Sequence, residues 1–271
     1  ELNRIISDKK AVQSKMSGKL HSKTFQGKLF EGVNNEHYAE IGELKFKSTI
    51  EILASRGFGL VSLFCVEAFE KHKGFTLFYV FEKIGSQDVI ILERVLKSVQ
   101  LTQLNQLNQS VKVKSIHTTS IAEIFPSAYQ YEREITDGFG VEFDNAFDKR
   151  KLFLHERYPD DFHPLLKSFK NGKIKMKSSL KPEDEYKFRE VHGEGVYQIP
   201  VGPVHAGIIE PGHFRFSVIG ETIFNLETRM FWKHRGIEKL AEDKPPAECV
   251  KIAETISGDE SVANSFAFCN A

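Results

Sequence analysis

The sequence predicts an α+β fold built from two modules, which are joined by a linker at residues 170–190. Three observations support it. Residues 44–55 carry apolar side chains at the helical period, whereas later segments alternate with the period of strands. Turns rich in Gly, Pro, Asn or Asp separate those strands. Residues 170–190 are rich in lysine and poor in aromatic side chains, as is typical of a connection between domains.

Length, charge and cysteine usage narrow the class of protein. A chain of 271 residues can form two domains with buried cores. Its 37 basic residues balance 37 acidic ones, which argues against a nucleic-acid partner because phosphate binding needs a basic excess. The longest apolar runs are shorter than the ~20 residues of a membrane-spanning helix. The three cysteines form no zinc pattern or disulfide framework, so we expect reduced thiols.

The first module follows a polar, Lys-rich stretch at residues 1–40, which we expect to be an arm or a few short strands. Leu44–Ser55 is then predicted to be a helix, because Phe46, Ile50 and Leu53 fall on one face. Three strands are predicted to follow, at 60–69, 75–82 and 89–96, and Gly85–Asp88 forms the turn between the last two.

A second helix is predicted to close the first module. Residues 101–110, LTQLNQLNQS, favour a surface turn or helix end over a functional polar tract, and residues 111–117 alternate as a strand does. Residues 118–138 predict the helix, with Thr119 or Ser120 as its cap and Glu123 completing a capping box. The module is thus a helix, an antiparallel β-meander and a second helix.

The second module is predicted to begin at about Val191, with strands at 196–199, 214–218 and 222–232. Gly220-Glu221 is a two-residue turn signal between the last two strands. From Gly236 onward the pattern is helical, and the Pro pair at 245–246 suits the first turn of a helix. The pattern stops at Ala271 without a cap, which we interpret as truncation of a longer chain.

Residues 132–143, EREITDGFGVEF, combine acids and an arginine at helical spacing. Such spacing predicts ion-paired side chains, and the glycines allow a tight exit from the helix. No His or Cys lies near enough in sequence to suggest a nucleophile, so a structural or interface role is favoured over catalysis. The residues assigned to this role are Glu132, Arg133, Glu134, Asp137, Phe139 and Gly140.

The first resemblance to a known family rests on EREITDGFGVEF followed by KRKLFLHERYPDDFHPLLKSF. This pattern resembles the signature of the C-type peripheral-arm subunit of respiratory complex I, with Lys149-Arg150-Lys151 as a small departure from it. The resemblance implies a C-type domain at residues 41–169. Such a domain carries no redox centre and packs beside the quinone-handling subunit.

The second resemblance rests on GPVHAGIIEPGHFRF and HRGIEKL. Both resemble the start of the D-type subunit of complex I and of the large subunit of group 4 [NiFe] hydrogenases. A C-type domain fused ahead of a D-type domain is the arrangement of the large subunit in formate-hydrogenlyase and hydrogenase-4 complexes. The resemblance implies that residues 191–271 are the N-terminal part of a D-type domain, with its β-rich start and first helices.

The residues at positions 257 and 260 argue against a nickel–iron centre. Hydrogenases of this family have Arg-Ile-Cys-Gly-x-Cys after the Arg-Gly-Ile-Glu element, and this chain reads Thr-Ile-Ser-Gly-Asp-Glu there. Ser257 and Glu260 stand at the two thiolate positions, and oxygen ligands favour hard ions over nickel held by soft sulfur. The resemblance therefore implies the cysteine-lacking branch, with no metal bound by this chain.

The loop at residues 202–213 is the candidate site. In complex I the equivalent loop handles the quinone headgroup with a His before a Gly, but here Pro211 precedes Gly212. The resemblance therefore assigns a proton-relay or quinone-contact role to Glu210, His205 and His213, since a carboxyl group and a histidine both transfer protons near neutral pH. The alternative is that the two histidines only satisfy backbone groups. A further set forms either a buried ion pair that fixes the loop or weak surface pairs: Arg215, Arg235 and Glu238.

The resemblance implies a peripheral-arm subunit of a membrane-associated, complex I-like or hydrogenase-4-like oxidoreductase that moves electrons toward quinone. The expected partners are an iron–sulfur small subunit and membrane subunits, which would supply the iron–sulfur clusters and the quinone site, and no nucleic acid. The expected location is the cytoplasmic side of the inner membrane, and the isolated chain is expected to be inactive. The alternatives are a non-catalytic scaffold or assembly subunit and, more weakly, a working [NiFe] hydrogenase.

Overall fold

The computed structural model describes residues 36–70, 72–96, 116–170, 172, 174–181, 185–207, 209–230 and 232–271. The chain divides into two compact units, Glu1–Arg150 and Lys151–Ala271, and each is described by itself. The predictions for residues 1–35 and 101–115 lie outside the described residues. Among the helices that the structure describes, none combines the length and the apolar character needed to cross a bilayer.

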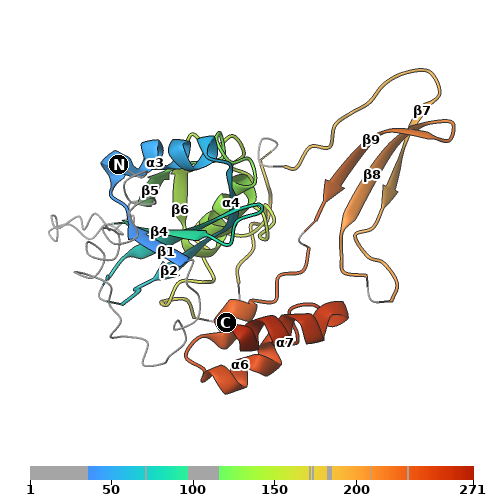
Figure 1. The fold of residues 1–271 in the computed structure, drawn as a ribbon. Helices are drawn as coiled ribbons and strands as arrows, with labels where there is room; N and C mark the ends of the chain where they lie inside the picture. Colours follow the sequence, from blue (N-terminus) through green and yellow to red (C-terminus); the bar gives the residue numbers. More distant parts are fainter. Residues whose placement is uncertain are drawn as a thin grey trace, which may run out of the picture. The chain divides into compact units, whose positions relative to one another are not determined.

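The first unit is built on a four-stranded sheet (Figure 1). Its strands are β1 (Glu36–Glu40), β2 (Phe58–Glu67), β3 (Phe75–Lys83) and β4 (Val89–Leu96), in the order β1-β4-β3-β2. β2, β3 and β4 pair antiparallel, so the predicted meander is confirmed. β1 pairs parallel with β4, and this pairing was not predicted.

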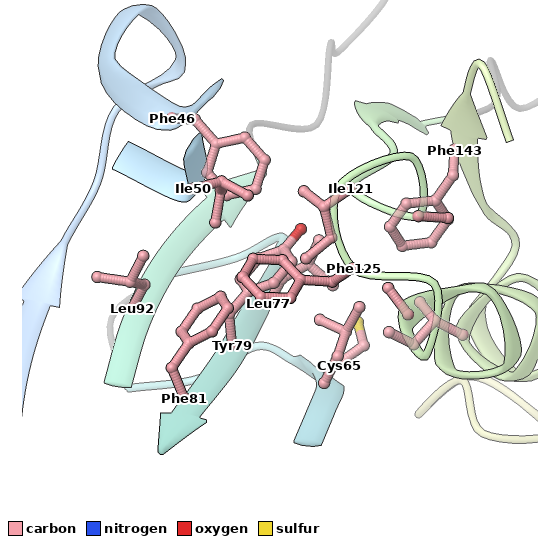
Figure 2. Packing of buried hydrophobic residues seen from close by; sticks show 14 of the residues in the cluster. Phe46, Ile50, Cys65, Leu77, Tyr79, Phe81, Leu92, Ile121, Phe125 and Phe143 are labelled. Atoms are coloured by element: carbon pink, nitrogen blue, oxygen red, sulfur yellow. The ribbon is translucent and has the colours of Figure 1, made fainter. Parts of the chain in front are cut away.

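Helix α3 (Glu43–Ser55) forms as predicted and covers one face of this sheet. Phe46, Ile50 and Leu53 lie on its inner face and are at most 1% exposed. In Figure 2, Phe46 and Ile50 face the strand residues around Tyr79, and the ring centres of Phe46 and Tyr79 are 5.1 Å apart. Burying side chains of this size stabilises a fold by ~1.5–3 kcal/mol each. The helical period of the sequence therefore corresponds to the main core of this unit.

The predicted helix at residues 118–138 is wrong in its first half. Residues Ile116–Thr119 form strand β5, which pairs parallel with β6 (Val141–Asp144), and only Ala128–Phe139 form helix α4. The carboxylate of Glu132 accepts hydrogen bonds from the Ser120 hydroxyl (2.7 Å) and the Ile121 N–H (2.8 Å). The Ser120 N–H, which a capping box would pair with Glu123, donates instead to the Asp144 carbonyl at 3.0 Å. The pairing of β5 with β6 takes Thr118 and Thr119 out of the predicted helix.

The second unit contains a three-stranded antiparallel sheet followed by short helices. The strands are β7 (Val196–Val201), β8 (His213–Ile219) and β9 (Thr222–Arg229), in the order β7-β8-β9. The helices are α5 (Ile237–Ala241), α6 (Pro246–Ala253), the 3₁₀ turn η1 (Gly258–Glu260) and α7 (Ser261–Asn270). The predicted hairpin and helices are confirmed, although β9 ends at Arg229 rather than at residue 232. The α+β class is therefore correct for both units.

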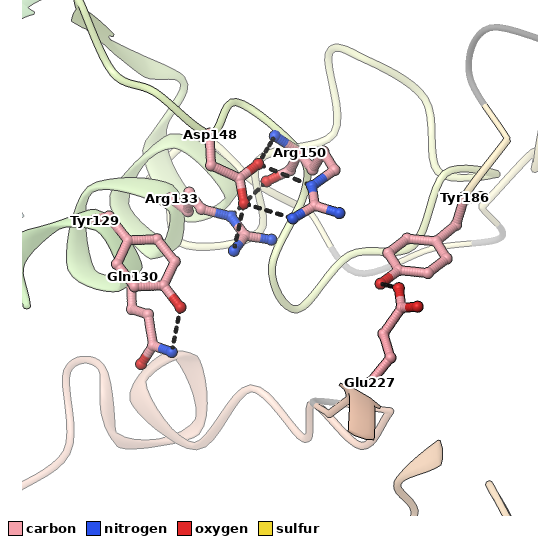
Figure 3. Close-up of polar contacts among 7 residues, drawn as sticks. All are labelled: Tyr129, Gln130, Arg133, Asp148, Arg150, Tyr186 and Glu227. Carbon is pink, nitrogen blue, oxygen red and sulfur yellow. Dashed lines mark hydrogen bonds and ion pairs between the residues drawn. The ribbon is translucent and has the colours of Figure 1, made fainter. Parts of the chain in front are cut away.

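One face of the three-stranded sheet is covered by residues 185–189, which the sequence assigned to the linker. The Tyr186 hydroxyl donates to the Glu227 carboxylate on β9 at 2.8 Å, as Figure 3 shows. The Arg189 N–H donates to the other oxygen of that carboxylate at 2.9 Å. Arg229 stacks over the Tyr186 ring at 4.3 Å. These residues therefore belong structurally to the sheet of the second unit.

Candidate functional site

The loop between β7 and β8 is closed at its base by three hydrogen bonds. The Gly212 N–H donates to the Pro203 carbonyl (3.1 Å), His205 Nε2 to the Gly212 carbonyl (2.8 Å) and His213 Nδ1 to the Gly202 carbonyl (3.2 Å). Gly202 has a φ of 78°. A Cβ at Gly202 would lie 2.1 Å from the Gly212 carbonyl oxygen, so only glycine fits there. The two ends of the loop are thus held together by its own histidines.

These bonds fix which ring nitrogen of each histidine carries a proton. A carbonyl only accepts, so Nε2 of His205 and Nδ1 of His213 must be the donors. The remaining nitrogen of His213, Nε2, is buried and has no hydrogen-bond partner among the described residues. Both histidines therefore bind backbone carbonyls, which is the alternative considered for them, and the buried Nε2 of His213 takes no part in that role.

Glu210 lies apart from this hydrogen-bond system. Its carboxylate is half exposed and approaches the Lys233 ammonium at 3.9 Å. In the described part of the chain it forms no hydrogen bond to His205 or His213. Val204 and Ile209 of the same loop are also exposed. The loop therefore has a fixed base that holds the two histidines and an exposed outer part that carries the acid.

Arg215 continues the polar face of β8 beyond His213. Its guanidinium lies 3.8 Å above the centre of the Phe188 ring, and the ring of His213 lies 4.9 Å from the same ring. Phe188 thus packs against both side chains, and a guanidinium over an aromatic face contributes ~1–2 kcal/mol when partly desolvated. No ion pair joins Arg215 to an acid among the described residues. Arg215 therefore stacks on Phe188 and does not form the ion pair considered for it.

Arg235 binds backbone carbonyls and not the acid of the ion pair considered for it. Its guanidinium donates to the carbonyl oxygens of Thr255 and Ile256, the latter at 2.6 Å. Glu238 lies exposed in the first turn of α5. Arg235 therefore fixes the turn that immediately precedes Ser257, so the Arg-Gly-Ile-Glu element and the substituted ligand segment are physically connected.

The residues at the expected ligand positions do not fit a nickel–iron group. Ser257 offers a hydroxyl and Glu260 is an exposed carboxylate at the end of η1, whereas such a group needs thiolates. The nearest buried thiol in sequence, Cys249, donates to the Ala241 carbonyl at 3.7 Å and to the Lys244 carbonyl at 3.9 Å, at the end of α5 and in the turn after it. In the described ranges, no three His, Cys, Asp or Glu side chains are grouped so that they could hold a metal ion.

The motif residues of α4 have structural contacts. Glu132 is 2% exposed, and burial raises the pKa of its carboxyl group even though the Ile121 N–H and the Ser120 hydroxyl favour the charged form. Phe139 packs edge-on against Phe75 at 5.9 Å. Gly140 ends the helix with a left-handed φ of 73°. Asp137 is buried on the same helix, where Glu134 is half-buried.

Arg133 connects α4 to the segment that follows β6. Its Nε donates to the Arg150 carbonyl (2.7 Å), and its Nη1 lies 3.3 Å from Asp148. Arg150 binds the same carboxylate through two nitrogens at 2.9 and 2.8 Å (Figure 3). The hydrogen bonds from Arg150 hold the pKa of Asp148 below its usual value, against the opposing effect of burial. The arginine of the motif thus pairs with an aspartate beyond β6.

Sequence reasoning missed the residues that cover and brace the candidate site. Phe188 and Tyr186 lay in the predicted linker, and Asp148 had no assigned role. The alternation of Tyr186 and Phe188 is a strand-like signal that pointed to packing on a sheet, but the surrounding lysines obscured it.

The comparisons with known proteins agree with this arrangement. The family described as respiratory-chain NADH dehydrogenase, 30 Kd subunit, matches residues 40–175. Hydrogenase-4 component G of Escherichia coli (strain K12) is 36% identical over 152 residues, which cover 56% of this chain and 27% of that protein. Formate hydrogenlyase subunit 5 of the same strain is 32% identical over 150 residues, which cover 55% of this chain and 26% of that protein.

A third relative joins the two expected domain types in its name. The C/D subunit of NADH-quinone oxidoreductase from Bacteroides thetaiotaomicron is 27% identical over 163 residues, which cover 55% of this chain and 31% of that protein. These matches confirm the resemblance expected from the sequence. The matched part of this chain spans between a quarter and a third of the length of each relative.

Proposed function

Because this chain belongs to the family of the respiratory-chain NADH dehydrogenase 30 Kd subunit, we propose that it works as a peripheral-arm subunit of a membrane-associated oxidoreductase. That complex is of the complex I-like or hydrogenase-4-like kind and moves electrons toward quinone. The similarity to hydrogenase-4 component G and to the C/D subunit of NADH-quinone oxidoreductase supports this assignment. The partners in the proposal are an iron–sulfur small subunit and membrane subunits, and the location is the cytoplasmic side of the inner membrane.

The observation that carries the finer proposal is the closed loop at residues 202–213. His205 and His213 act as positioning residues, because their N–H groups hold the loop base through the Gly212 and Gly202 carbonyls. Glu210 is the proton-carrying group, since its carboxylate is half exposed beside Lys233 on the outer part of the loop. A quinone bound in the assembled complex would supply the redox chemistry, and this chain would deliver a proton to it. No nickel–iron chemistry is included, because Ser257 and Glu260 replace the thiolates.

The test is Glu210→Gln in the full-length protein within its complex, with quinone reduction as the measured activity. Gln keeps the size of the side chain but cannot transfer a proton, so we expect the rate to fall by about 10- to 100-fold, as is typical when one acid–base group is lost. Glu221→Gln, in the exposed turn between β8 and β9, is the control and should keep full activity. The isolated chain should show no turnover in the same assay, and robust activity of the isolated chain would contradict the proposal.

A second candidate function is a non-catalytic scaffold or assembly subunit. Two observations favour it: the thiolate positions are occupied by Ser257 and Glu260, and Glu210 forms no hydrogen bond to either loop histidine among the described residues. On this alternative, Glu210→Gln leaves electron transfer in the full complex unchanged, whereas removal of the chain prevents assembly. Stoichiometric nickel in the purified full-length protein would instead support the working hydrogenase.

A further inference from the structure

The densest positive charge in the second unit lies in residues 167–181, here called the basic loop. From His163 to Lys181 the sequence carries six lysines and no acidic residue. In this loop the side chains of Lys167, Lys170, Lys175 and Lys181 are exposed. A chain whose charges balance over its full length therefore concentrates positive charge in one short segment.

Two sets of contacts anchor the basic loop, one at its start and one at Lys177. At its start, the Leu166 carbonyl accepts a hydrogen bond from the Lys239 ammonium at 2.8 Å, and the Phe169 ring packs edge-on against Phe162 at 5.4 Å. These contacts tie the beginning of the loop to α5 and to the preceding segment. The backbone at the start of the loop is therefore held in place.

The second anchor lies at Lys177. Its N–H donates to the Arg157 carbonyl at 2.8 Å, and its ammonium donates to the Asp160 carboxylate at 2.7 Å. The Arg157 guanidinium in turn lies 3.4 Å from the Ser178 carbonyl oxygen. Lys177 thus attaches the loop to the preceding segment, so its charge is not counted among those that bind a partner.

Apolar side chains alternate with the lysines between the anchors. Ile174 and Met176 are 42% and 38% exposed, and Lys175 stands between them. An acidic protein surface would need only the charges. A lipid surface uses both kinds of side chain, because ammonium groups bind the headgroup phosphates while aliphatic side chains enter the boundary with the acyl chains.

We propose that the basic loop binds the surface of a membrane that contains anionic phospholipids. Lys170, Lys175 and Lys181 contact the phosphates, and Ile174 and Met176 insert between the headgroups. This inference goes beyond the proposed function and does not rest on it, since it involves neither the loop at 202–213 nor electron transfer.

The experiment measures partition of the full chain onto phosphatidylcholine vesicles with and without phosphatidylglycerol. We expect binding only when phosphatidylglycerol is present, and binding should weaken as salt is added because the interaction is screened over about 8 Å at physiological ionic strength. Each lysine near an anionic surface contributes about fivefold to partition. The triple variant Lys170→Gln, Lys175→Gln, Lys181→Gln should therefore bind about 100-fold more weakly.

A matched control removes the same charge elsewhere. Lys47→Gln, Lys83→Gln, Lys251→Gln changes three exposed lysines outside the basic loop and should leave partition unchanged. The double variant Ile174→Ser, Met176→Ser should weaken binding while keeping its salt dependence. Circular dichroism of each variant checks that the fold is retained.

Three results would overturn the proposal. The first is no binding to phosphatidylglycerol vesicles, and the second is equal loss of binding in both triple variants. The third is binding to a polyglutamate peptide without binding to vesicles, which would identify an acidic protein as the partner. None of these outcomes depends on quinone reduction, so failure here and failure of the proposed function are distinguishable.

Discussion

At the scale of single residues, buried charges and tight glycines determine how the two units respond to substitution. Asp148 is a largely buried charge, because its side chain is 9% exposed and two arginines bind it. Gly202 is the clearest tight glycine, because the Gly212 carbonyl oxygen fills the space of a side chain. Each residue leads to a prediction. The control is a residue of the same type that lies in an exposed or open position.

Asp148→Asn should lower the free energy of unfolding by ~1–3 kcal/mol at neutral pH, because it removes the negative charge that Arg133 and Arg150 both bind. The folded-state pKa of Asp148 is lowered, so the pair stabilises the fold above the ordinary value of 3.8 and this contribution is lost as the pH falls through the lower folded-state pKa. Urea denaturation should therefore separate the variant from the parent at neutral pH and bring the two together in acid.

The control for this prediction is Asp160→Asn. Asp160 also pairs with a lysine, but its side chain is 81% exposed, so the loss should be at most ~1 kcal/mol. Equal losses for the two aspartates would show that burial is not what gives the Asp148 pair its strength.

Gly202→Ala should disrupt the base of the candidate loop. The added Cβ meets the Gly212 carbonyl oxygen, and Gly202 has a positive φ as well. Gly207→Ala is the matched control, since Gly207 has a φ of 70° but open space around its Cα, so it should cost only ~1–2 kcal/mol. We expect Gly202→Ala to cost ~1–3 kcal/mol more. Hydrogen exchange of the Gly212 amide, which is bonded to Pro203, measures the opening directly.

At the scale of elements, short sequence patterns predicted helices and turns correctly. They failed where the structure depends on pairing between strands that are distant in sequence. The helix at Leu44–Ser55 and the turn at Gly85–Asp88 were found because their signals lie within a few residues. The pairings of β1 with β4 and of β5 with β6 are parallel and join distant residues, so no short pattern reports them.

The failed half of the predicted helix has a specific cause. A capping box pairs the Ser120 N–H with Glu123, but in the structure this N–H donates to the Asp144 carbonyl, which lies far away in sequence. For the candidate loop, the sequence named His205 and His213 but left open whether they serve the backbone or a ligand. Only the positions of the Gly202 and Gly212 carbonyls answer that question, and these depend on the path of the whole loop.

Helix α3 offers a test of the core with a control in the same element. Leu53→Ala removes a side chain that is 0% exposed and should lower the free energy of unfolding by ~2–5 kcal/mol. Leu44→Ala removes a side chain that is fully exposed, so its effect should stay within ~0.5 kcal/mol. Urea denaturation followed by circular dichroism measures both. Similar losses would mean that the helix does not pack as Figure 2 shows.

At the scale of the whole molecule, each unit has its own stabilising contacts. The main core cluster belongs entirely to the first unit, whereas Phe188 packs between Arg215 and His213 in the second. The single tryptophan of the chain, Trp232, lies in the second unit and donates from its indole N–H to the Arg229 carbonyl. Its fluorescence therefore reports on that unit.

We predict that substitutions in the two units act independently. Phe188→Ala should shift the Trp232 fluorescence transition by ~1–3 kcal/mol because it removes the ring on which Arg215 stacks. Leu53→Ala should leave that transition unchanged while it shifts the circular-dichroism signal of the first unit. A shift of Trp232 fluorescence by Leu53→Ala alone would refute the independence of the units.

The contact of Arg235 with the carbonyls of Thr255 and Ile256 has a consequence for sequence change. Both acceptors are backbone atoms, which are present whatever side chains the turn carries. These two hydrogen bonds therefore do not depend on the side chains at positions 257 and 260. Substitution of cysteines by Ser257 and Glu260 would leave both bonds in place. A lineage could in this way exchange the side chains at these two positions in single mutational steps and still keep the backbone of the turn.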